Sequence, residues 1–141
     1  LEEYDIPLEG KNALVIGRSN IVGRPMVMML EQAGCTVTVA HSKTTKDSLI
    51  ENFVSADIVV SAVGKRNVVS DAEFLPSKRL KDKVLIDVGM NRDENGKLCG
   101  DFSEELKQKA VYYTPTPGGT GPMTVAMLMQ NVIEFYENYY F

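Results

Sequence analysis

Short apolar runs that end in glycine, separated by longer amphipathic stretches, constrain the fold of this chain most strongly. The run at residues 12–17 is apolar after its first residue, and the runs at 57–64 and 83–89 are largely apolar. Strands that are apolar throughout are typical of a parallel sheet that is buried on both faces. Parallel strands need a crossover between them, and the intervening stretches have helical spacing.

The other segments follow the same alternation. Residues 35–40 and 111–114 have the composition of strands, and residues 91–101 contain a hairpin-type turn signal at Gly96. A first helix is expected with Pro25 in its first turn and Gly34 just past its end. Further helices are expected at residues 45–55, at residues 103–110, and from Pro122 onward. The pattern predicts an α/β fold of the doubly wound Rossmann type, a mainly parallel sheet with helices on both faces, in one domain over residues 1–141.

Composition excludes several classes of protein. The chain of 141 residues is 44% hydrophobic and 24% charged, as expected of a globular domain, and no run approaches the roughly 20 apolar residues of a membrane helix. A net charge of −4 argues against nucleic acid as a partner. Cys35, Cys99 and the single histidine, His41, have no metal-ligand spacing. We expect a cytoplasmic, metal-free domain with reduced cysteines. The missing initiator methionine favours a fragment of a longer protein.

The loop after the first predicted strand has the features of a phosphate site. Gly17 and Gly23 flank a polar turn that leads into a helix, where backbone N–H groups and the helix dipole favour a pyrophosphate. The spacing departs from G-x-G-x-x-G, because Ser19 stands at the second glycine position and the last glycine comes one residue late. Taken alone, this loop leaves nucleotide binding and a purely structural turn evenly balanced.

The end of the second predicted strand bears on the choice of cofactor. NAD-binding domains place a carboxylate there to bond the ribose 2′-hydroxyl, but residues 40–44 contain none. Arg18, Ser42 and Lys43 could instead donate hydrogen bonds to a 2′-phosphate. NADP is therefore favoured over NAD. The alternative interpretation is that Ser42 and Lys43 are ordinary loop residues without a ligand.

Prolines and glycines concentrate in one loop, at residues 114–124. Three of the six prolines and three of the eleven glycines fall there, after the last predicted strand. Prolines restrict the backbone while glycines permit close approach, which suits a shaped wall beside a ligand. The alternative is a chain reversal that serves no ligand.

Four ordered segments together resemble the methylenetetrahydrofolate dehydrogenase/cyclohydrolase family of one-carbon metabolism. Residues 15–25 resemble its cofactor loop, 41–44 its segment at the adenosine ribose, 86–91 its fourth-strand motif, and 117–124 its signature loop. The resemblance covers only the cofactor half of a two-domain family. It implies that the parent oxidises 5,10-methylenetetrahydrofolate with NADP and then hydrolyses the methenyl product.

The resemblance also implies site residues. Met90 replaces the usual isoleucine and Thr120 the usual valine, at positions that contribute mainly backbone contacts. The residues implied to bind the cofactor are Gly17, Arg18, Ser19, Ser42, Met90 and Thr124. Those implied to border the substrate cleft are Pro117, Gly118 and Gly119.

No catalytic residue is expected in this chain. The family's catalytic lysine lies in a Tyr-x-x-x-Lys motif of the folate-binding N-terminal domain, and no tyrosine here has a lysine at that spacing. Neither His41 nor Lys65 is a credible substitute. The chain is therefore expected to bind cofactor without turnover. The alternatives are a non-catalytic nucleotide-binding module and another NADP-linked dehydrogenase that shares only the cofactor fold.

Four further expectations concern structure and assembly. Asp87, near a strand end, is expected to hold neighbouring backbone N–H groups, with a catalytic base as the lesser alternative, and both cysteines are expected to be packing residues. The family commonly pairs through its cofactor domains, so we expect a homodimer to which residues 91–101 contribute an arm. The family's final helix packs toward the N-terminal domain, so Tyr136, Tyr139, Tyr140 and Phe141 are expected to lack that partner surface.

Overall fold

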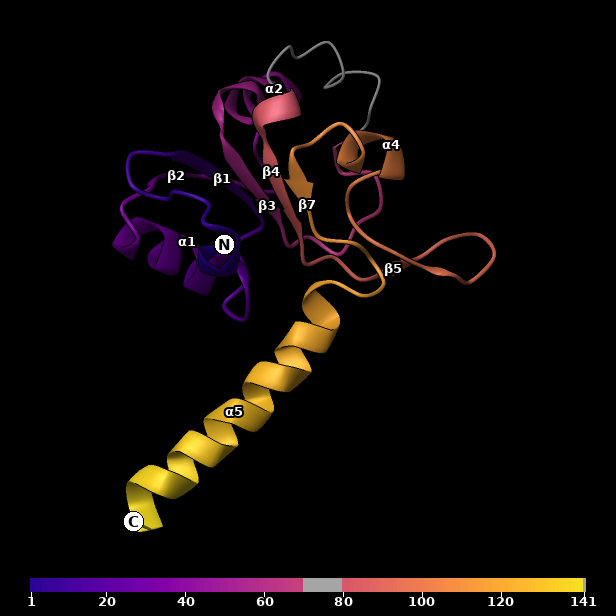
Figure 1. Ribbon diagram of the computed structural model, residues 1–141. Helices are drawn as coiled ribbons and strands as arrows, with labels where there is room; N and C mark the ends of the chain where they lie inside the picture. The colour runs from indigo at the N-terminus through magenta and orange to yellow at the C-terminus, as the bar shows by residue number, and fades with distance from the viewer. Residues whose placement is uncertain (70–79, 141) are drawn as a thin grey trace.

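A five-stranded parallel sheet forms the centre of the molecule, as the computed structural model shows (Figure 1). The structure describes residues 1–69 and 80–140. The strand order is β2-β1-β3-β4-β7, and each neighbouring pair is parallel. The strands are β1 (Asn12–Ile16), β2 (Thr36–Ala40), β3 (Ile58–Ser61), β4 (Val84–Asp87) and β7 (Tyr112–Tyr113). All five lie within the predicted segments and are shorter, and the glycines that end the predicted segments of β1, β3 and β4 lie in the loops that follow.

Helices cover both faces of this sheet, which confirms the doubly wound architecture. On one face, α1 (Gly23–Gln32) contributes Leu30 to a core that also contains Val15 of β1. On the other face, α2 (Lys46–Ser55) and α4 (Glu104–Lys107) pack against the alternate residues of the same strand, including Leu14. β1 is therefore buried on both sides, which explains its continuous apolar sequence.

The helix boundaries follow local signals, with two small differences from the prediction. Thr45 caps α2 by accepting a hydrogen bond from the Ser48 N–H, and Ser103 caps α4 by accepting one from Leu106. α4 ends at Lys107 rather than at residue 110, because the next turn closes through shorter i to i+3 bonds. The final helix, α5 (Thr120–Tyr140), starts two residues earlier than expected, with Pro122 in its first turn.

The α5 helix projects away from the sheet and buries none of its residues (Figure 1). No helix in the described part of the chain is long and apolar enough to cross a membrane. Phe141 of the predicted terminal aromatic cluster lies outside the described residues. The exposed large hydrophobic side chains of α5 are Met123, Val125, Met127, Leu128, Met129, Val132, Ile133, Phe135, Tyr136, Tyr139 and Tyr140.

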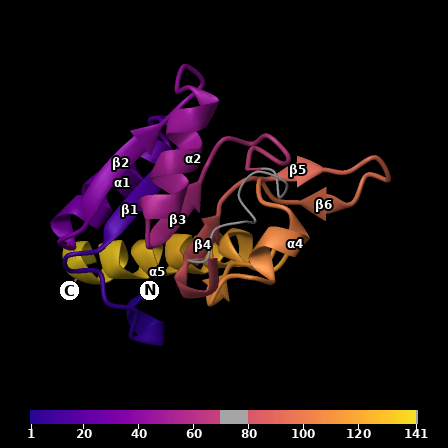
Figure 2. The same ribbon diagram turned by 90° about the horizontal axis from the view of Figure 1, so that it is seen from above.

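The predicted hairpin is present and extends from the sheet (Figure 2). It consists of β5 (Asn91–Arg92) and β6 (Leu98–Cys99), which pair in antiparallel register. The Asp93 carboxylate accepts hydrogen bonds from two backbone N–H groups of the turn, and Gly96 adopts a positive φ of 76°. Short 3-10 turns at Glu2–Tyr4 and Leu80–Asp82 complete the described elements.

Candidate functional site

The carboxyl ends of β1, β2 and β3 enclose a cavity of about 450 Å³. This is the edge at which doubly wound sheets bind their ligands. The volume lies within the range of small-molecule sites. The cavity is lined by Ile16, Gly17, Arg18, Ser19, Ala40, His41, Ser42, Leu49, Ala62, Val63, Lys65 and Val68.

Close packing explains both glycines of the first loop. Gly17 has a φ of 119°, and a Cβ there would lie 2.6 Å from the carbonyl oxygen of Ala62 at the end of β3. A Cβ on Gly23 would overlap the carbonyl oxygen of Gly17. The loop therefore lies tightly between β3 and the start of α1, which gives the glycines a structural reason in addition to any ligand.

Ser19 holds this loop against the amino end of α1. Its hydroxyl oxygen accepts hydrogen bonds from the N–H groups of Val22 (3.2 Å) and Gly23 (3.3 Å). A serine hydroxyl that accepts two bonds can still donate one. Ser19 thus combines a loop-forming role with a donor at a helix N-terminus, where an anion is favoured.

Local bonds also shape the turn after β2. The N–H of His41 donates to the Thr44 hydroxyl at 2.9 Å, and the Lys43 N–H donates to Nδ1 of His41 at 3.2 Å. His41 is thus a hydrogen-bonded loop residue. Ser42, between them, is exposed and lines the cavity.

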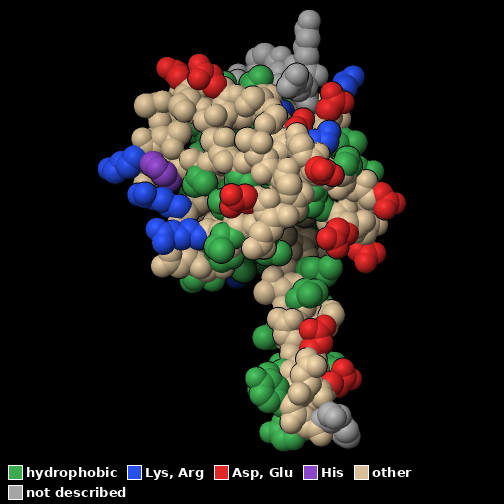
Figure 3. All heavy atoms as spheres, turned by 90° about the vertical axis from the view of Figure 1, so that its left-hand side faces the viewer, with side chains coloured by type: hydrophobic (Ala, Val, Ile, Leu, Met, Phe, Trp, Pro, Cys, Tyr) green, Lys and Arg blue, Asp and Glu red, His purple; other side chains and the backbone are tan. Residues whose placement is uncertain are grey.

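The charge of the cavity wall is positive. Arg18 and Lys65 line it, and no carboxylate is present among the described lining residues. Figure 3 shows Lys and Arg side chains gathered around the histidine at this edge of the body. An anionic ligand is favoured there.

The structure brings together only part of the predicted site. Gly17, Arg18, Ser19 and Ser42 line the cavity, whereas the other predicted residues do not. Met90 follows β4 and is 73% exposed. Thr124 lies one turn into α5, and its hydroxyl donates to the carbonyl of Thr120, the first residue of the helix, at 2.8 Å. The predicted cleft residues, Pro117, Gly118 and Gly119, belong to the loop between β7 and α5.

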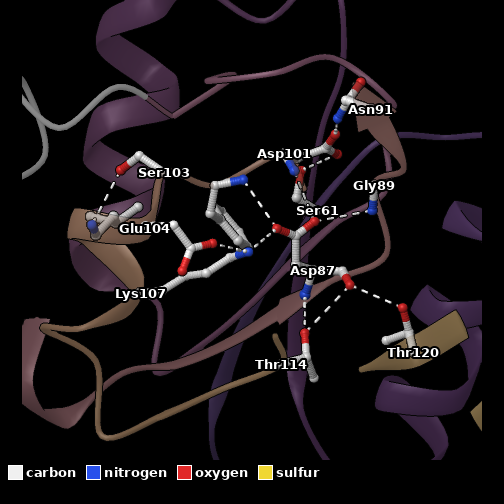
Figure 4. A network of polar contacts seen from close by, with 12 residues as sticks. Ser61, Asp87, Gly89, Asn91, Asp101, Ser103, Glu104, Lys107, Thr114 and Thr120 are labelled. Carbon is white, nitrogen blue, oxygen red and sulfur yellow. Dashed lines mark hydrogen bonds and ion pairs between the residues drawn. The ribbon is translucent and has the colours of Figure 1, made fainter. Parts of the chain in front are cut away.

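The backbone of Asp87 anchors that loop at both ends. Its N–H donates to the Thr114 hydroxyl at 2.7 Å, and its carbonyl accepts a bond from the Thr120 hydroxyl at 3.1 Å. Figure 4 shows both threonines directed at Asp87. The 114–120 segment is therefore fixed to Asp87, the last residue of β4.

The Asp87 carboxylate forms the centre of a buried polar network (Figure 4). It accepts hydrogen bonds from the N–H groups of Gly89, Asp101 and Phe102 at 2.9–3.2 Å. It also pairs with Lys107 at 3.0 Å, and both side chains are 0% exposed. The expectation that Asp87 holds backbone N–H groups is confirmed. Four donors surround this buried carboxylate, so it is poorly placed to act as a base on a ligand.

Sequence interpretation missed several residues of this edge. Ala62, Val63 and Lys65 directly follow β3, so the rule that ligands bind at carboxyl ends could have identified them. Leu49 and Val68 carried no such signal. Asp101 and Lys107 were also missed, because their contacts with Asp87 join residues far apart in sequence.

Neither cysteine contributes to the site. The Cys35 thiol is buried and donates to the Leu8 carbonyl at 3.1 Å. Burial raises the pKa of this thiol, and the negative charge of Asp57 raises it further. The thiol therefore stays protonated and is a packing residue. The described residues contain no cluster of three or more His, Cys, Asp or Glu side chains that could hold a metal ion.

Comparison with known proteins relates this geometry to a family. Residues 1–140 match the model for the tetrahydrofolate dehydrogenase/cyclohydrolase, NAD(P)-binding domain. The bifunctional protein FolD of Burkholderia ambifaria is 55% identical over 137 residues, which cover 96% of this chain and 46% of that relative. The chain thus spans about half the length of the curated relatives it matches.

Solved structures show the same similarity. The bifunctional FolD methylenetetrahydrofolate dehydrogenase/cyclohydrolase of Campylobacter jejuni is 43% identical, with a TM-score of 0.85 over 97% of this chain and 46% of its own. The Trypanosoma brucei dehydrogenase-cyclohydrolase, solved with NADP and an inhibitor, is 33% identical, with a TM-score of 0.83 over 97% of this chain and 47% of its own. The chain belongs to the tetrahydrofolate dehydrogenase/cyclohydrolase family and corresponds to its NAD(P)-binding domain.

Proposed function

We propose that residues 1–141 form the NADP-binding domain of a 5,10-methylenetetrahydrofolate dehydrogenase/cyclohydrolase. The observation that carries this proposal is the cavity at the carboxyl ends of β1–β3. Arg18 and Lys65 line this cavity, and none of its described lining residues has a carboxylate. Membership of the family and the NADP bound to the Trypanosoma brucei relative support the choice of ligand.

The proposal assigns the residues of the cavity to three parts of the cofactor. The Gly17–Ser19 turn presents backbone N–H groups and the Ser19 hydroxyl to the pyrophosphate at the start of α1. Arg18 and Ser42 meet the 2′-phosphate, which a carboxylate would repel. Leu49 and Val68 supply apolar surface beside Ser42 for the adenosine.

The other predicted residues are assigned to the nicotinamide end. Met90 follows β4, and Thr124 lies near the start of α5, so both lie at the same edge of the sheet but beyond the cavity. Pro117, Gly118 and Gly119 border the space where folate would meet the cofactor. The nicotinamide ring of bound, oxidised NADP would accept the hydride, and this chain would orient that ring.

The exposed α5 helix fits a role as a contact surface in the parent protein. Its apolar side chains are far more extensive than isolated surface hydrophobics, and surfaces of this kind mark interfaces. Because the chain spans about half of its relatives, we propose that the remaining half packs on α5 and supplies the folate surface and the catalytic lysine.

The cellular setting is also part of the proposal. We place the protein in the cytoplasm, because both cysteines are unpaired thiols, as is usual in a reducing compartment. A net charge of −4 makes nucleic acid an unsuitable partner. The interaction proposed for the parent is with a tetrahydrofolate substrate.

Replacing Arg18 with alanine should weaken NADPH binding selectively. A hydrogen bond to a charged group contributes about 1.5–3 kcal/mol, so the Kd for NADPH should rise roughly 10- to 150-fold. NADH, which lacks the 2′-phosphate, should be affected much less. Arg92→Ala is the charge-matched control, because Arg92 lies in the hairpin away from the cavity.

The original chain and both variants are titrated with NADPH and with NADH, and nicotinamide fluorescence gives the Kd for each cofactor. Equal losses for NADPH and NADH would contradict the role of Arg18.

We predict that the chain forms a homodimer at micromolar concentration. The projecting β5–β6 hairpin and the exposed edge strand β7 offer backbone for pairing between copies. Light scattering should give twice the chain mass of 15.6 kDa. A mass near that of a single chain throughout the micromolar range would refute the prediction.

The chain should bind NADPH without oxidising methylenetetrahydrofolate. Positioning of the two reactants supplies several kcal/mol of barrier reduction, and the folate surface is not among these residues. A dehydrogenase assay should give the rate of the no-protein control, while NADPH binding by the same sample shows that the site is formed. Turnover well above that control, in protein free of host enzyme, would be incompatible with the proposal.

A further inference from the structure

The Asp101 carboxylate bonds to one turn at the mouth of the cavity. It accepts the consecutive backbone N–H groups of Val63 (2.9 Å), Gly64 (3.3 Å) and Lys65 (3.0 Å). It also accepts the Ser61 hydroxyl at 2.8 Å, while the residue itself is 0% exposed. Hydrogen bonds to an ionised carboxylate are stronger than those between neutral groups. The turn is therefore gathered around a single buried negative charge.

This turn lies outside the regular sheet. β3 ends at Ser61, and the next residue, Ala62, is the last one bonded to β1, through its N–H and the carbonyl of Ile16 at 2.8 Å. Val63 is 42% exposed although it lines the cavity, so burial does little to fix it. The Asp101 carboxylate supplies the partners that a neighbouring strand would otherwise provide.

Asp101 reaches the far end of the same segment through its backbone. Its carbonyl accepts the N–H of Val68 at 3.3 Å, and Val68 also lines the cavity. The side chain of Asn91 donates to the Asp101 carboxylate at 2.9 Å, which ties the start of β5 to the same point. One residue thus fixes both ends of the 63–68 wall and links it to the end of β4.

The position of Asp101 is itself closely determined. Its N–H donates to the Asp87 carboxylate, which Lys107 neutralises. A Cβ on Gly89 would overlap the Asp101 carboxylate, and one on Gly100 would overlap that of Asp87. Neither carboxylate has room to shift toward these backbones, so the network can hold the turn in one place.

We propose that Asp101 is a positioning residue for the dinucleotide cavity, with the identity of the ligand resting on the proposed function. Its buried carboxylate holds the Val63–Lys65 turn as the wall that faces Arg18 and Ser42. Preorganisation of this wall removes the cost of ordering the turn when the cofactor binds.

The Asp101→Asn variant tests this role with two readouts. The amide replaces one acceptor oxygen with a donor that faces backbone donors, so the turn should loosen. The Kd for NADPH should rise by about 10-fold or more, since several charge-assisted bonds are lost. Hydrogen exchange of the free protein should accelerate at Val63, Gly64 and Lys65.

Two control variants separate positioning from general loss of stability. Asp93→Asn makes the same change in a carboxylate that accepts two backbone N–H groups of the hairpin, and should change the Kd by no more than about two-fold. Ile58→Ala opens a gap at the opposite, amino end of β3 and should lower Tm while its Kd also stays within about two-fold of the original. A folded Asp101→Asn protein that binds NADPH as tightly as these controls would overturn the proposal.

Exchange in the unmodified chain provides a test that does not require the variant to fold. The Val63, Gly64 and Lys65 amides should be protected even though the turn is exposed, and exchange at unstructured rates would overturn the proposal. If the unmodified chain fails to bind NADPH, the proposed function is wrong, and the exchange of these three amides still decides whether Asp101 holds the turn.

Discussion

The buried ion pair between Asp87 and Lys107 is the contact on which the ligand-binding edge of this sheet depends. Removing one partner of such a pair leaves an uncompensated charge in the interior, which typically costs about 3–5 kcal/mol. Lys107 neutralises a carboxylate that also accepts three backbone N–H groups, including that of Asp101. The Asp87 backbone meanwhile anchors Thr114 and Thr120. Two loops that are distant in sequence are thereby fixed to the end of β4.

The ligand-binding edge of the sheet has two parts, which are held in place by different contacts. The cavity at β1–β3 carries the cationic side chains and the proposed phosphate-binding loop, and this loop is held by packing around Gly17. The loops at β4 and β7 are held by the Asp87 network. Asp101 joins the two parts, since it bonds to Asp87 on one side and to the Val63–Lys65 turn on the other. The proposed cofactor would extend across both parts, so their relative placement matters for binding.

Local signals were sufficient to predict the sheet, the helices and four of the residues that line the cavity. Apolar runs identified the strands, and Gly17, Arg18, Ser19 and Ser42 lie beside strand ends, where sequence position alone implies proximity. Asp101 is 40 residues from Ser61 along the chain, and that separation hides their hydrogen bond. Lys107 stands three residues after Glu104, a spacing typical of an exposed helical pair, although its side chain is fully buried. The direction of α5 was equally unpredictable, because no packing against the sheet fixes it.

Backbone NMR of the 15N-labelled chain during titration with NADPH tests the central claim most directly. The amide signals of Gly17, Ser19, Ser42 and the Val63–Lys65 turn should shift most and should saturate together. Those of the β5–β6 turn and of the amino ends of the strands should shift little. Saturable shifts centred on those distant regions, or none at the carboxyl ends of β1–β3, would contradict the assignment of this edge as the cofactor site.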